Sequence, residues 1–333
     1  MAAIALVAGY LTIPIDRMNR ATLDLDMDWA GSLTITSGLI LVVYALSASA
    51  SGGNSNVWTT PSVLAPFVVG LVCLALAVYI EGWVARSPLM PFTFFQPKGV
   101  KPFMIGSLFL YGCFGVWLFT VTTYLEVQYG VKGFKTVLWF LPLAAGGIFF
   151  AITGSALLHV VPIFILLCVS ALAFVAAPLL MALAHIDAGY WPFVFPAMVC
   201  GTLGIDITYT ISCVFLTSAQ PVRFQGLAGA ICSLLVNLAI AFSLSFAEIV
   251  ESKAFQPGHG LSAHDVQARM KRSSQAAFWF ATASAAVGVI VVVLFVRVSR
   301  KTVNSATEER SQGSDQQMSA EDARRADEGH EIV

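Results

Sequence analysis

Asp206 is an acidic residue in the middle of an otherwise apolar segment, residues 191–217. Thr202 and Thr210 lie one helical turn before and after it, and Tyr209 is beside them, so a helix would put these side chains on or near one face. An ionisable side chain at mid-membrane costs about 2.5–3.5 kcal/mol on insertion scales, so it should face a cavity or a polar partner. Protonation removes the charge, which suits the residue to carrying protons. The alternative is a buried aspartate that only holds helices together.

Two other segments carry polar side chains at helical spacing. Residues 102–125 contain Ser107 and Tyr111, which could line a pocket for an apolar, partly polar solute or belong to ordinary interfacial aromatic decoration. Residues 224–247 contain a row of small and amide side chains, one every four positions: Gln225, Gly229, Ser233 and Asn237, followed by Ala241 and Ser245. Small residues let helix backbones approach closely and amides bridge between helices. The row therefore predicts a helix-packing surface, with substrate contact by Asn237 as the alternative.

Motifs of membrane enzymes are absent from the sequence, which has no His-Glu-x-x-His, Gly-x-Ser-x-Gly or phosphate-binding Gly-Lys-Ser/Thr loop. The cysteines all lie in apolar segments and form no Cys-x-x-Cys pair: Cys73, Cys113, Cys168, Cys200, Cys213 and Cys232. This spacing indicates neither a disulfide framework nor a zinc site, and free cysteine usually packs as a small apolar side chain. We predict a protein that is not an enzyme, with no catalytic residues, no metal and no cofactor.

The amino-acid composition indicates which kind of structural element carries these residues. Apolar residues make up 57% of the chain and charged residues 11%, and the mean hydropathy is +0.80. A soluble domain carries about 25% charged residues. The excess of apolar residues falls into blocks of about 20, long enough to cross a bilayer, and such blocks must be helical because lipid offers backbone groups no partner. The net charge of −1 and the lack of a basic patch exclude nucleic acid as a partner.

The sequence thus predicts an all-α, polytopic transmembrane bundle in a lipid bilayer. Eight blocks have full length: about 30–49, 61–84, 102–125, 136–157, 160–184, 191–217, 224–247 and 276–297. A ninth, residues 1–14, would reach only about 21 Å as a helix. It lacks the basic start of a signal peptide, so we interpret it as the tail of a helix that begins outside this chain. Lys and Arg near the span ends favour a cytoplasmic tail and an external loop at 248–275.

Three segments resemble one family: DWAGSLTITSGLILVVYAL, FLPLAAGGIFFAITG, and residues 190–250, with YW…GTLGID…QGLAGA as the most specific part. They are similar to the fungal fourteen-span drug:proton antiporters of the major facilitator superfamily. The resemblance implies four regions. Residues 1–29 would be a truncated helix stub and cytoplasmic loop, 30–101 two extra linking helices, 102–297 the six-helix C-terminal repeat, and 298–333 a disordered cytoplasmic tail.

The resemblance also implies a function. In that superfamily the first and fourth helices of each half line the cavity and the second and fifth meet the other half, which puts Asp206 on the cavity and the Gln225 row on the interface. It implies proton-coupled efflux of drug-like or toxin-like small organic molecules, at the plasma membrane or, alternatively, the vacuolar membrane. Most of the N-terminal half is missing from the pattern, so we expect a separate half or self-association to complete the site. The alternative is a transport-incompetent interaction or regulatory half-protein.

One departure from the family pattern concerns a short loop. The family's Gly-x-Leu-x-x-Arg is replaced here by GSALLHVVP, in which His159 lies near the basic position. A gating contact at this loop is therefore not expected from the resemblance.

Overall fold

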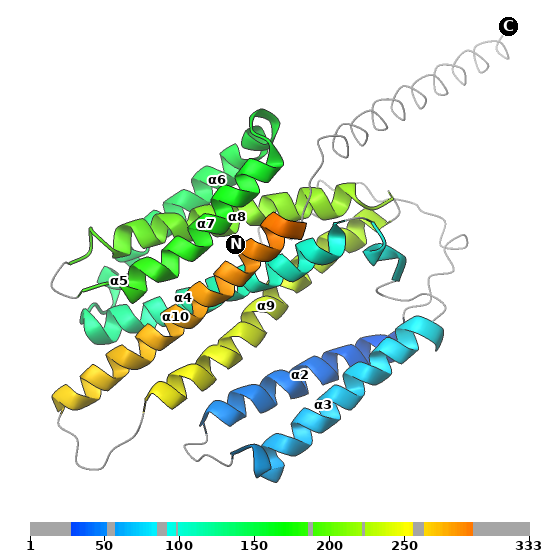
Figure 1. The fold of residues 1–333 in the computed structure, drawn as a ribbon, viewed down its shortest axis with the longest axis horizontal. Coiled ribbons are helices and arrows are strands. Elements are labelled where there is room, and N and C mark those ends of the chain that lie inside the picture. Colours follow the sequence, from blue (N-terminus) through cyan, green and yellow to red (C-terminus); the bar gives the residue numbers. More distant parts are fainter. Residues whose placement is uncertain are drawn as a thin grey trace, which may run out of the picture.

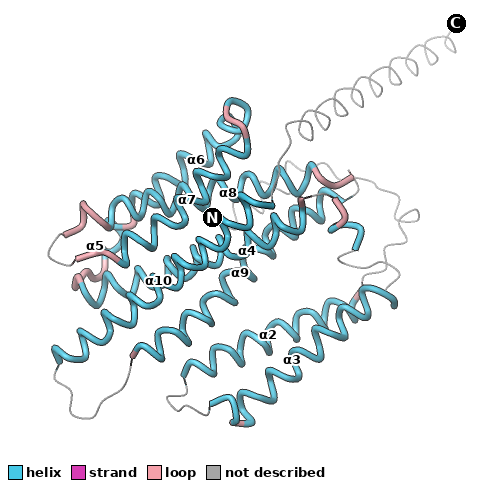
Figure 2. Tube along the Cα trace, in the orientation of Figure 1, coloured by secondary structure: helices cyan, strands magenta, loops and turns pink. Residues whose placement is uncertain are grey.

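The computed structural model describes residues 28–51, 57–84, 92–97, 99–185, 189–221, 224–255 and 263–295. Within these ranges the regular elements are helices, and no strand occurs (Figures 1 and 2). Seven of the described helices are long and apolar enough to cross a membrane. The predicted all-α polytopic bundle is confirmed. The segment 1–14, the loop up to residue 27 and the tail from residue 296 lie outside the described residues.

The two helices that were predicted as linking spans form an antiparallel hairpin. They are α2, Trp29–Ser51, and α3, Pro61–Tyr79, joined through a short 3₁₀ helix η2, Val57–Thr59, and α3 continues into a π-helical turn η3, Ile80–Val84. Two glycines permit the close crossing: a Cβ added to Gly38 would lie 2.9 Å from Leu74, and one added to Gly70 would lie 2.8 Å from Val42. The hairpin rests on the bundle through contacts between α2 and α9 (Figure 1).

The predicted repeat contains six long helices and the short helix α5, and the short helix η4 precedes it. The elements are η4 (Phe92–Phe95), α4 (Val100–Gln128), α5 (Phe134–Trp139), α6 (Leu141–Val160), α7 (Ile163–Ala182), α8 (Val194–Ser218), α9 (Gln225–Ala254) and α10 (Ala263–Phe295). The predicted span 136–157 begins differently, because α5 ends at Trp139 and a new helix starts with Pro142 in its first turn. The apolar part of α6, Leu141–Gly154, is therefore shorter than the seven long spans.

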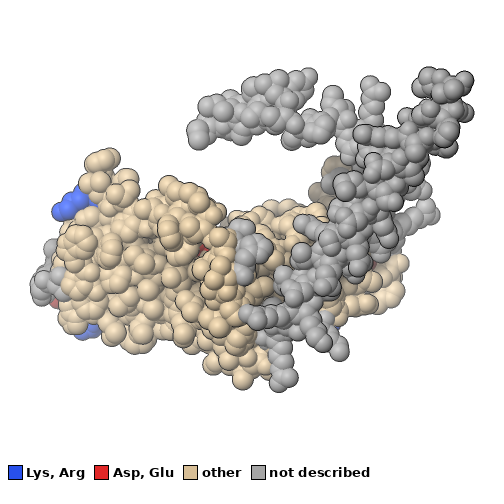
Figure 3. Space-filling model, turned by 90° about the horizontal axis from the view of Figure 1, so that it is seen from above, with Lys and Arg blue, Asp and Glu red and all other residues tan. Residues whose placement is uncertain are grey.

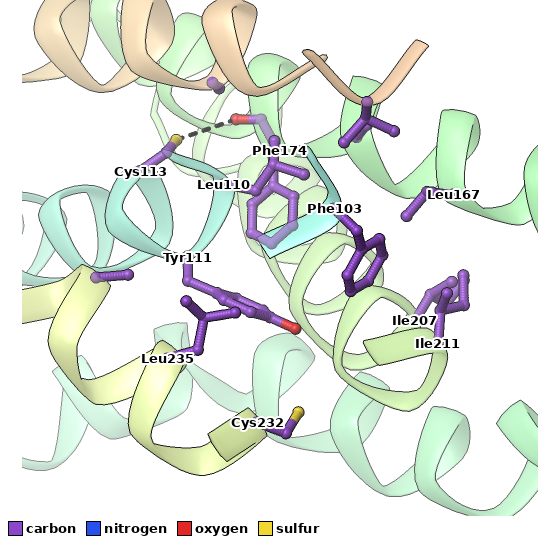
Figure 4. Close-up of a cluster of buried hydrophobic side chains, with 14 of the residues drawn as sticks. Phe103, Leu110, Tyr111, Cys113, Leu167, Phe174, Ile207, Ile211, Cys232 and Leu235 are labelled. Carbon is purple, nitrogen blue, oxygen red and sulfur yellow. Dashed lines mark hydrogen bonds between the residues drawn. The ribbon is translucent and has the colours of Figure 1, made fainter. Parts of the chain in front are cut away.

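Helix α4 lies at the centre of the repeat and packs against α7, α9 and α10. Glycines bring its neighbours close: a Cβ on Gly106 would lie 2.7 Å from Val292 of α10, and one on Gly115 would lie 2.7 Å from Ile240 of α9. Tyr111 and Trp117 of α4 are almost completely buried between these helices. Figure 4 shows Tyr111 beside Leu235 in this core. The helix is thus the scaffold against which the other spans are positioned.

The sequence prediction of a long loop at 248–275 is wrong. Helix α9 continues to Ala254 and α10 already begins at Ala263. Polar contacts explain why these residues stay helical: the Ser273 hydroxyl donates to the Glu251 carbonyl at 2.9 Å, and the Gln128 side chain donates to the Gln267 carbonyl at 3.2 Å. Polar residues near the ends of spans therefore extend two helices here instead of forming a loop.

Aromatic side chains close one end of the repeat, where α4 and α7 end and α6 and α8 begin. The Trp139 ring lies 5.6 Å from the Tyr129 ring and 4.8 Å from the Tyr190 ring, and the Lys135 ammonium lies 5.7 Å from the Trp139 centroid. The Tyr190 hydroxyl donates to the Trp139 carbonyl at 3.0 Å, and burial raises the pKa of Tyr190, which keeps this donor protonated. Such rings suit a membrane–water interface.

The described surface carries few charges. Seen from above in Figure 3, it consists almost entirely of uncharged residues, and the basic side chains in view lie at one end. This distribution is what a bilayer requires of a protein surface, because a charge at the lipid-facing midplane is costly.

Candidate functional site

Asp206 and its predicted neighbours share one face of α8. The Thr202 hydroxyl donates to Asp206 Oδ2 at 2.6 Å, and the Thr210 hydroxyl donates to the Asp206 carbonyl at 2.8 Å. Thr202 is buried, whereas Asp206 and Thr210 are half-buried. The structure therefore brings together three residues that the sequence placed on one face, and it gives the carboxyl group a hydroxyl donor inside the span.

Helix α6 covers this polar face with glycines. A Cβ added to Gly147 would lie 3.7 Å from Asp206 Oδ2, and one added to Gly154 would lie 3.6 Å from the Thr210 hydroxyl oxygen. A Cβ on Gly146 would overlap Thr202. The backbone of α6 thus approaches the polar residues of α8 directly, with no side chain of these three positions between them. We call this contact, made by Gly146, Gly147 and Gly154 with Thr202, Asp206 and Thr210, the α6–α8 seam.

Tyr209 belongs to a different side of α8, which is open. Its side chain is 40% exposed and lies beside Cys213 of α8 and Ser233 of α9. Cys213 in turn contacts Cys232 of α9, with 3.5 Å between the two sulfur atoms. A residue predicted for the cavity and a residue predicted for the packing row therefore meet on one exposed surface where α8 and α9 cross.

The predicted row on α9 is exposed over its first part. Gly229, Ser233 and Asn237 are exposed, and a Cβ on Gly229 would meet nothing within 4 Å among the described residues. The Asn237 amide donates to the Ser233 carbonyl at 2.8 Å, and Gln225 is half-buried at the first turn. Within the described residues, Tyr209 of α8 lies at the edge of this stretch, and the stretch itself stays exposed. We refer to Tyr209 together with Gly229, Ser233 and Asn237 as the open α8–α9 surface.

Tyr111 and Ser107 lie in the core rather than on the open α8–α9 surface. The Tyr111 hydroxyl lies 2.6 Å from the Ser212 hydroxyl, and the Ser212 hydroxyl donates to the Thr208 carbonyl at 2.8 Å. The Thr208 hydroxyl donates to Ser170 of α7 at 2.9 Å. Ser107 is fully buried, and its hydroxyl has no hydrogen-bond partner among the described residues. The structure shows Tyr111 as a buried link between α4 and α8. A role of Tyr111 and Ser107 in a pocket stays a prediction.

Sequence reasoning missed two groups of polar residues. One is the buried hydroxyl group of Thr208, Ser212 and Ser170. The other involves the acids that the sequence assigned to a loop: the Glu248 carboxyl accepts from the Ser47 hydroxyl of α2 at 2.5 Å, and Glu251 accepts from the Thr120 hydroxyl of α4 at 3.4 Å. Helical spacing could have revealed the acids, because Glu251 follows Ala247 by four positions, one turn further along α9.

Together these features define a multi-pass helical membrane protein that holds a carboxyl group between two helices and presents a polar surface on another side of one of them. No family model matches the chain. It is similar to several curated transporters. The efflux pump terJ of Aspergillus terreus is 29% identical over 81% of this chain, and the low affinity ammonium transporter of Saccharomyces cerevisiae is 29% identical over 76% of it. The major facilitator superfamily multidrug transporter mdr3 of Aspergillus fumigatus is 23% identical over 91% of it.

These relatives are membrane transporters. Each is distant in sequence. The chain spans about half the length of the curated relatives it matches, with 49% of terJ, of the ammonium transporter and of mdr3 covered.

Proposed function

We propose that this chain forms the C-terminal half, with two linking helices, of a proton-coupled efflux transporter for drug-like or toxin-like small organic molecules. The observation that carries the proposal is the position of Asp206. Its carboxyl group is held by Thr202 in the middle of α8, and another side of the same helix contributes Tyr209 to the open α8–α9 surface. A carboxyl group that changes protonation beside a substrate surface can couple proton movement to transport.

The open α8–α9 surface is proposed as the substrate side of this half. Tyr209 offers an aromatic ring and a hydroxyl, and Ser233 and Asn237 add polar groups, which suits a substrate that is mostly apolar with a few polar atoms. Tyr111 would act behind this surface by holding α4 against α8, and Ser107 would be a further buried hydroxyl group of α4 there. Gln225 and Gly229 would meet the other half of the transporter, because small residues permit close helix contact.

A second candidate is a membrane interaction or regulatory protein without transport of its own. The exposed stretch with Gly229, Ser233 and Asn237 favours this candidate as well, since such a surface can dock another membrane protein. Under either candidate the chain is an integral multi-pass protein, and we place it in the plasma membrane, with the vacuolar membrane as the alternative.

The test is co-expression of this chain with the N-terminal six-helix half of a matching transporter. Inside-out vesicles are given a proton gradient, and accumulation of a fluorescent efflux substrate is measured with and without an uncoupler. The proposal expects uncoupler-sensitive transport with the Asp206 chain and none with Asp206→Asn at equal expression. Asn keeps the shape and can still accept from Thr202. Normal transport by Asp206→Asn would make the residue structural, and no transport with any matching half would favour the interaction protein.

A further inference from the structure

The α6–α8 seam has a space next to the Asp206 carboxyl group that one methyl group would fill. The position of a Cβ at Gly147 is 3.7 Å from Asp206 Oδ2 and 4.0 Å from the Thr202 hydroxyl oxygen, which is ordinary contact distance. Glycine therefore leaves the carboxyl group facing a peptide backbone and a small gap, whereas any other residue would place carbon against it. At Gly146 an added Cβ would instead overlap Thr202, so close packing accounts for that glycine.

We infer that Gly147 is a positioning residue for proton exchange at Asp206: it keeps the α6 side of the carboxyl group open, so that a small separation of α6 from α8 admits a proton carrier. This inference rests on the proposed proton coupling. Its physical basis is the cost of charge in an apolar setting, because carbon packed against a carboxylate disfavours the charged form. A backbone that carries only hydrogen atoms at this point avoids that cost.

The helices that pack against α8 carry several titratable groups, and no described contact joins those named here to Asp206. On α8, Tyr209 lies beside Cys213 and Ser233 on the open α8–α9 surface. On α9, Cys232 contacts Cys213. On α4, Tyr111 is bonded to Ser212, and Cys113 donates to the Phe174 carbonyl of α7 at 3.4 Å (Figure 4). On α7, Cys168 is a further thiol, and the described contacts of α6 at the seam are glycines. The described neighbours of the carboxyl group are Thr202 and the Gly147 position, both in the α6–α8 seam.

The experiment measures protonation of Asp206 without requiring transport. The full chain in mild detergent is treated with dicyclohexylcarbodiimide, which reacts with protonated carboxyl groups in apolar surroundings, over a range of pH. Labelling of the peptide that contains Asp206 is quantified by mass spectrometry, which separates it from Glu248 and Glu251. Asp206→Asn identifies the signal. Gly147→Ala is compared with Gly154→Ala, the matched control: it adds the same methyl group to the same helix, next to Thr210 rather than to the carboxyl group.

The expected result is a rise of about 0.5 pH unit or more in the labelling midpoint for Gly147→Ala, and no shift for Gly154→Ala. Gly147→Ser is expected to have a midpoint below that of Gly147→Ala, because its hydroxyl can donate to the carboxylate. A purely structural role for Gly147 would not separate Ala from Ser in this way. Size-exclusion profiles of the variants check that each remains folded.

Three results would overturn the inference: no shift for Gly147→Ala, an equal shift for Gly154→Ala, or no labelling of Asp206 at any pH. These results are independent of the transport assay. If Asp206→Asn abolishes efflux while Gly147→Ala leaves the midpoint unchanged, the proposed function stands and the role of Gly147 fails. If Asp206→Asn transports normally, the proposed function fails whatever the labelling shows.

Discussion

The hydrogen bond between the buried hydroxyl groups of Tyr111 and Ser212 predicts that Ser212→Ala destabilises the protein more than Tyr111→Phe does. Ser212 uses its hydrogen atom to donate to the Thr208 carbonyl, so Tyr111 must be the donor in the 2.6 Å contact between the two hydroxyl groups. Tyr111→Phe removes only that donor and leaves Ser212 bonded to Thr208. Ser212→Ala, in contrast, leaves the fully buried Tyr111 hydroxyl without its acceptor.

The magnitudes follow from this asymmetry. Tyr111→Phe should cost about 0.6 kcal/mol, and at most about 1.7 kcal/mol, the range for an interhelical hydrogen bond in a membrane protein. Ser212→Ala should cost about 1–3 kcal/mol, because it leaves the buried Tyr111 hydroxyl without a hydrogen-bond partner. The double variant should cost less than the sum of the two, since removing the Tyr111 hydroxyl relieves the penalty that Ser212→Ala creates.

The assay is reversible unfolding of the purified chain in mixed micelles with increasing sodium dodecyl sulfate, followed by circular dichroism and Trp fluorescence. The free energies of unfolding are compared in a double-mutant cycle, which includes the unchanged protein, the two single variants and the double variant. The reasoning would be refuted if Tyr111→Phe destabilised as much as Ser212→Ala, or if the two effects were additive. Either outcome would mean that the two hydroxyl groups are not joined in the folded protein.

Three further predictions concern packing, topology and assembly. Gly106→Ala should lower the free energy of unfolding by about 1–3 kcal/mol, because the added methyl group would lie 2.7 Å from Val292. Gly229→Ala should not lower it, because an added Cβ there would meet nothing within 4 Å. The same unfolding assay compares the two variants. In a cysteine-free background, Ser252→Cys should react with an impermeant maleimide from outside the cell only, and labelling from inside only would reverse the assigned orientation. The purified chain alone should run as a dimer or larger species on size exclusion and show no substrate-dependent proton flux in liposomes, and an active monomer would contradict this.

Much of the fold could be predicted from the sequence, because the bilayer dictates both the length and the helical form of an apolar segment. The common face of Thr202, Asp206 and Thr210 could be predicted for a similar reason, since helical spacing alone determines it. Spacing cannot say which helix covers a given face. Tyr111 was a pocket candidate by residue type, yet the packing of α4 at the centre of the bundle makes it part of the core.

The prediction of a loop at 248–275 failed because polar residues near the end of a span can either form a loop or extend the helix. Glu248 and Glu251 fall in the loop that was predicted for residues 248–275. In the structure they accept hydrogen bonds from Ser47 of α2 and Thr120 of α4, and these partners come from distant parts of the chain. The same limit applies to Gly147: a glycine in an apolar segment predicts close packing, but only the tertiary structure shows that its neighbour is a carboxyl group.

Helix α9 differs along its length in a way that bears on both proposed functions. Near its end, Ser245 and Ala247 are buried and Glu248 binds α2, so the hairpin covers that part. Near its start, Ser233 and Asn237 are exposed, and the Asn237 amide can satisfy only one of its donors through the Ser233 carbonyl. Hydrocarbon offers the remaining amide groups no partner. This part of α9 should therefore face water, a substrate or another protein surface rather than lipid. Docking of a partner would satisfy either function, so only the transport measurement separates an efflux transporter from an interaction protein.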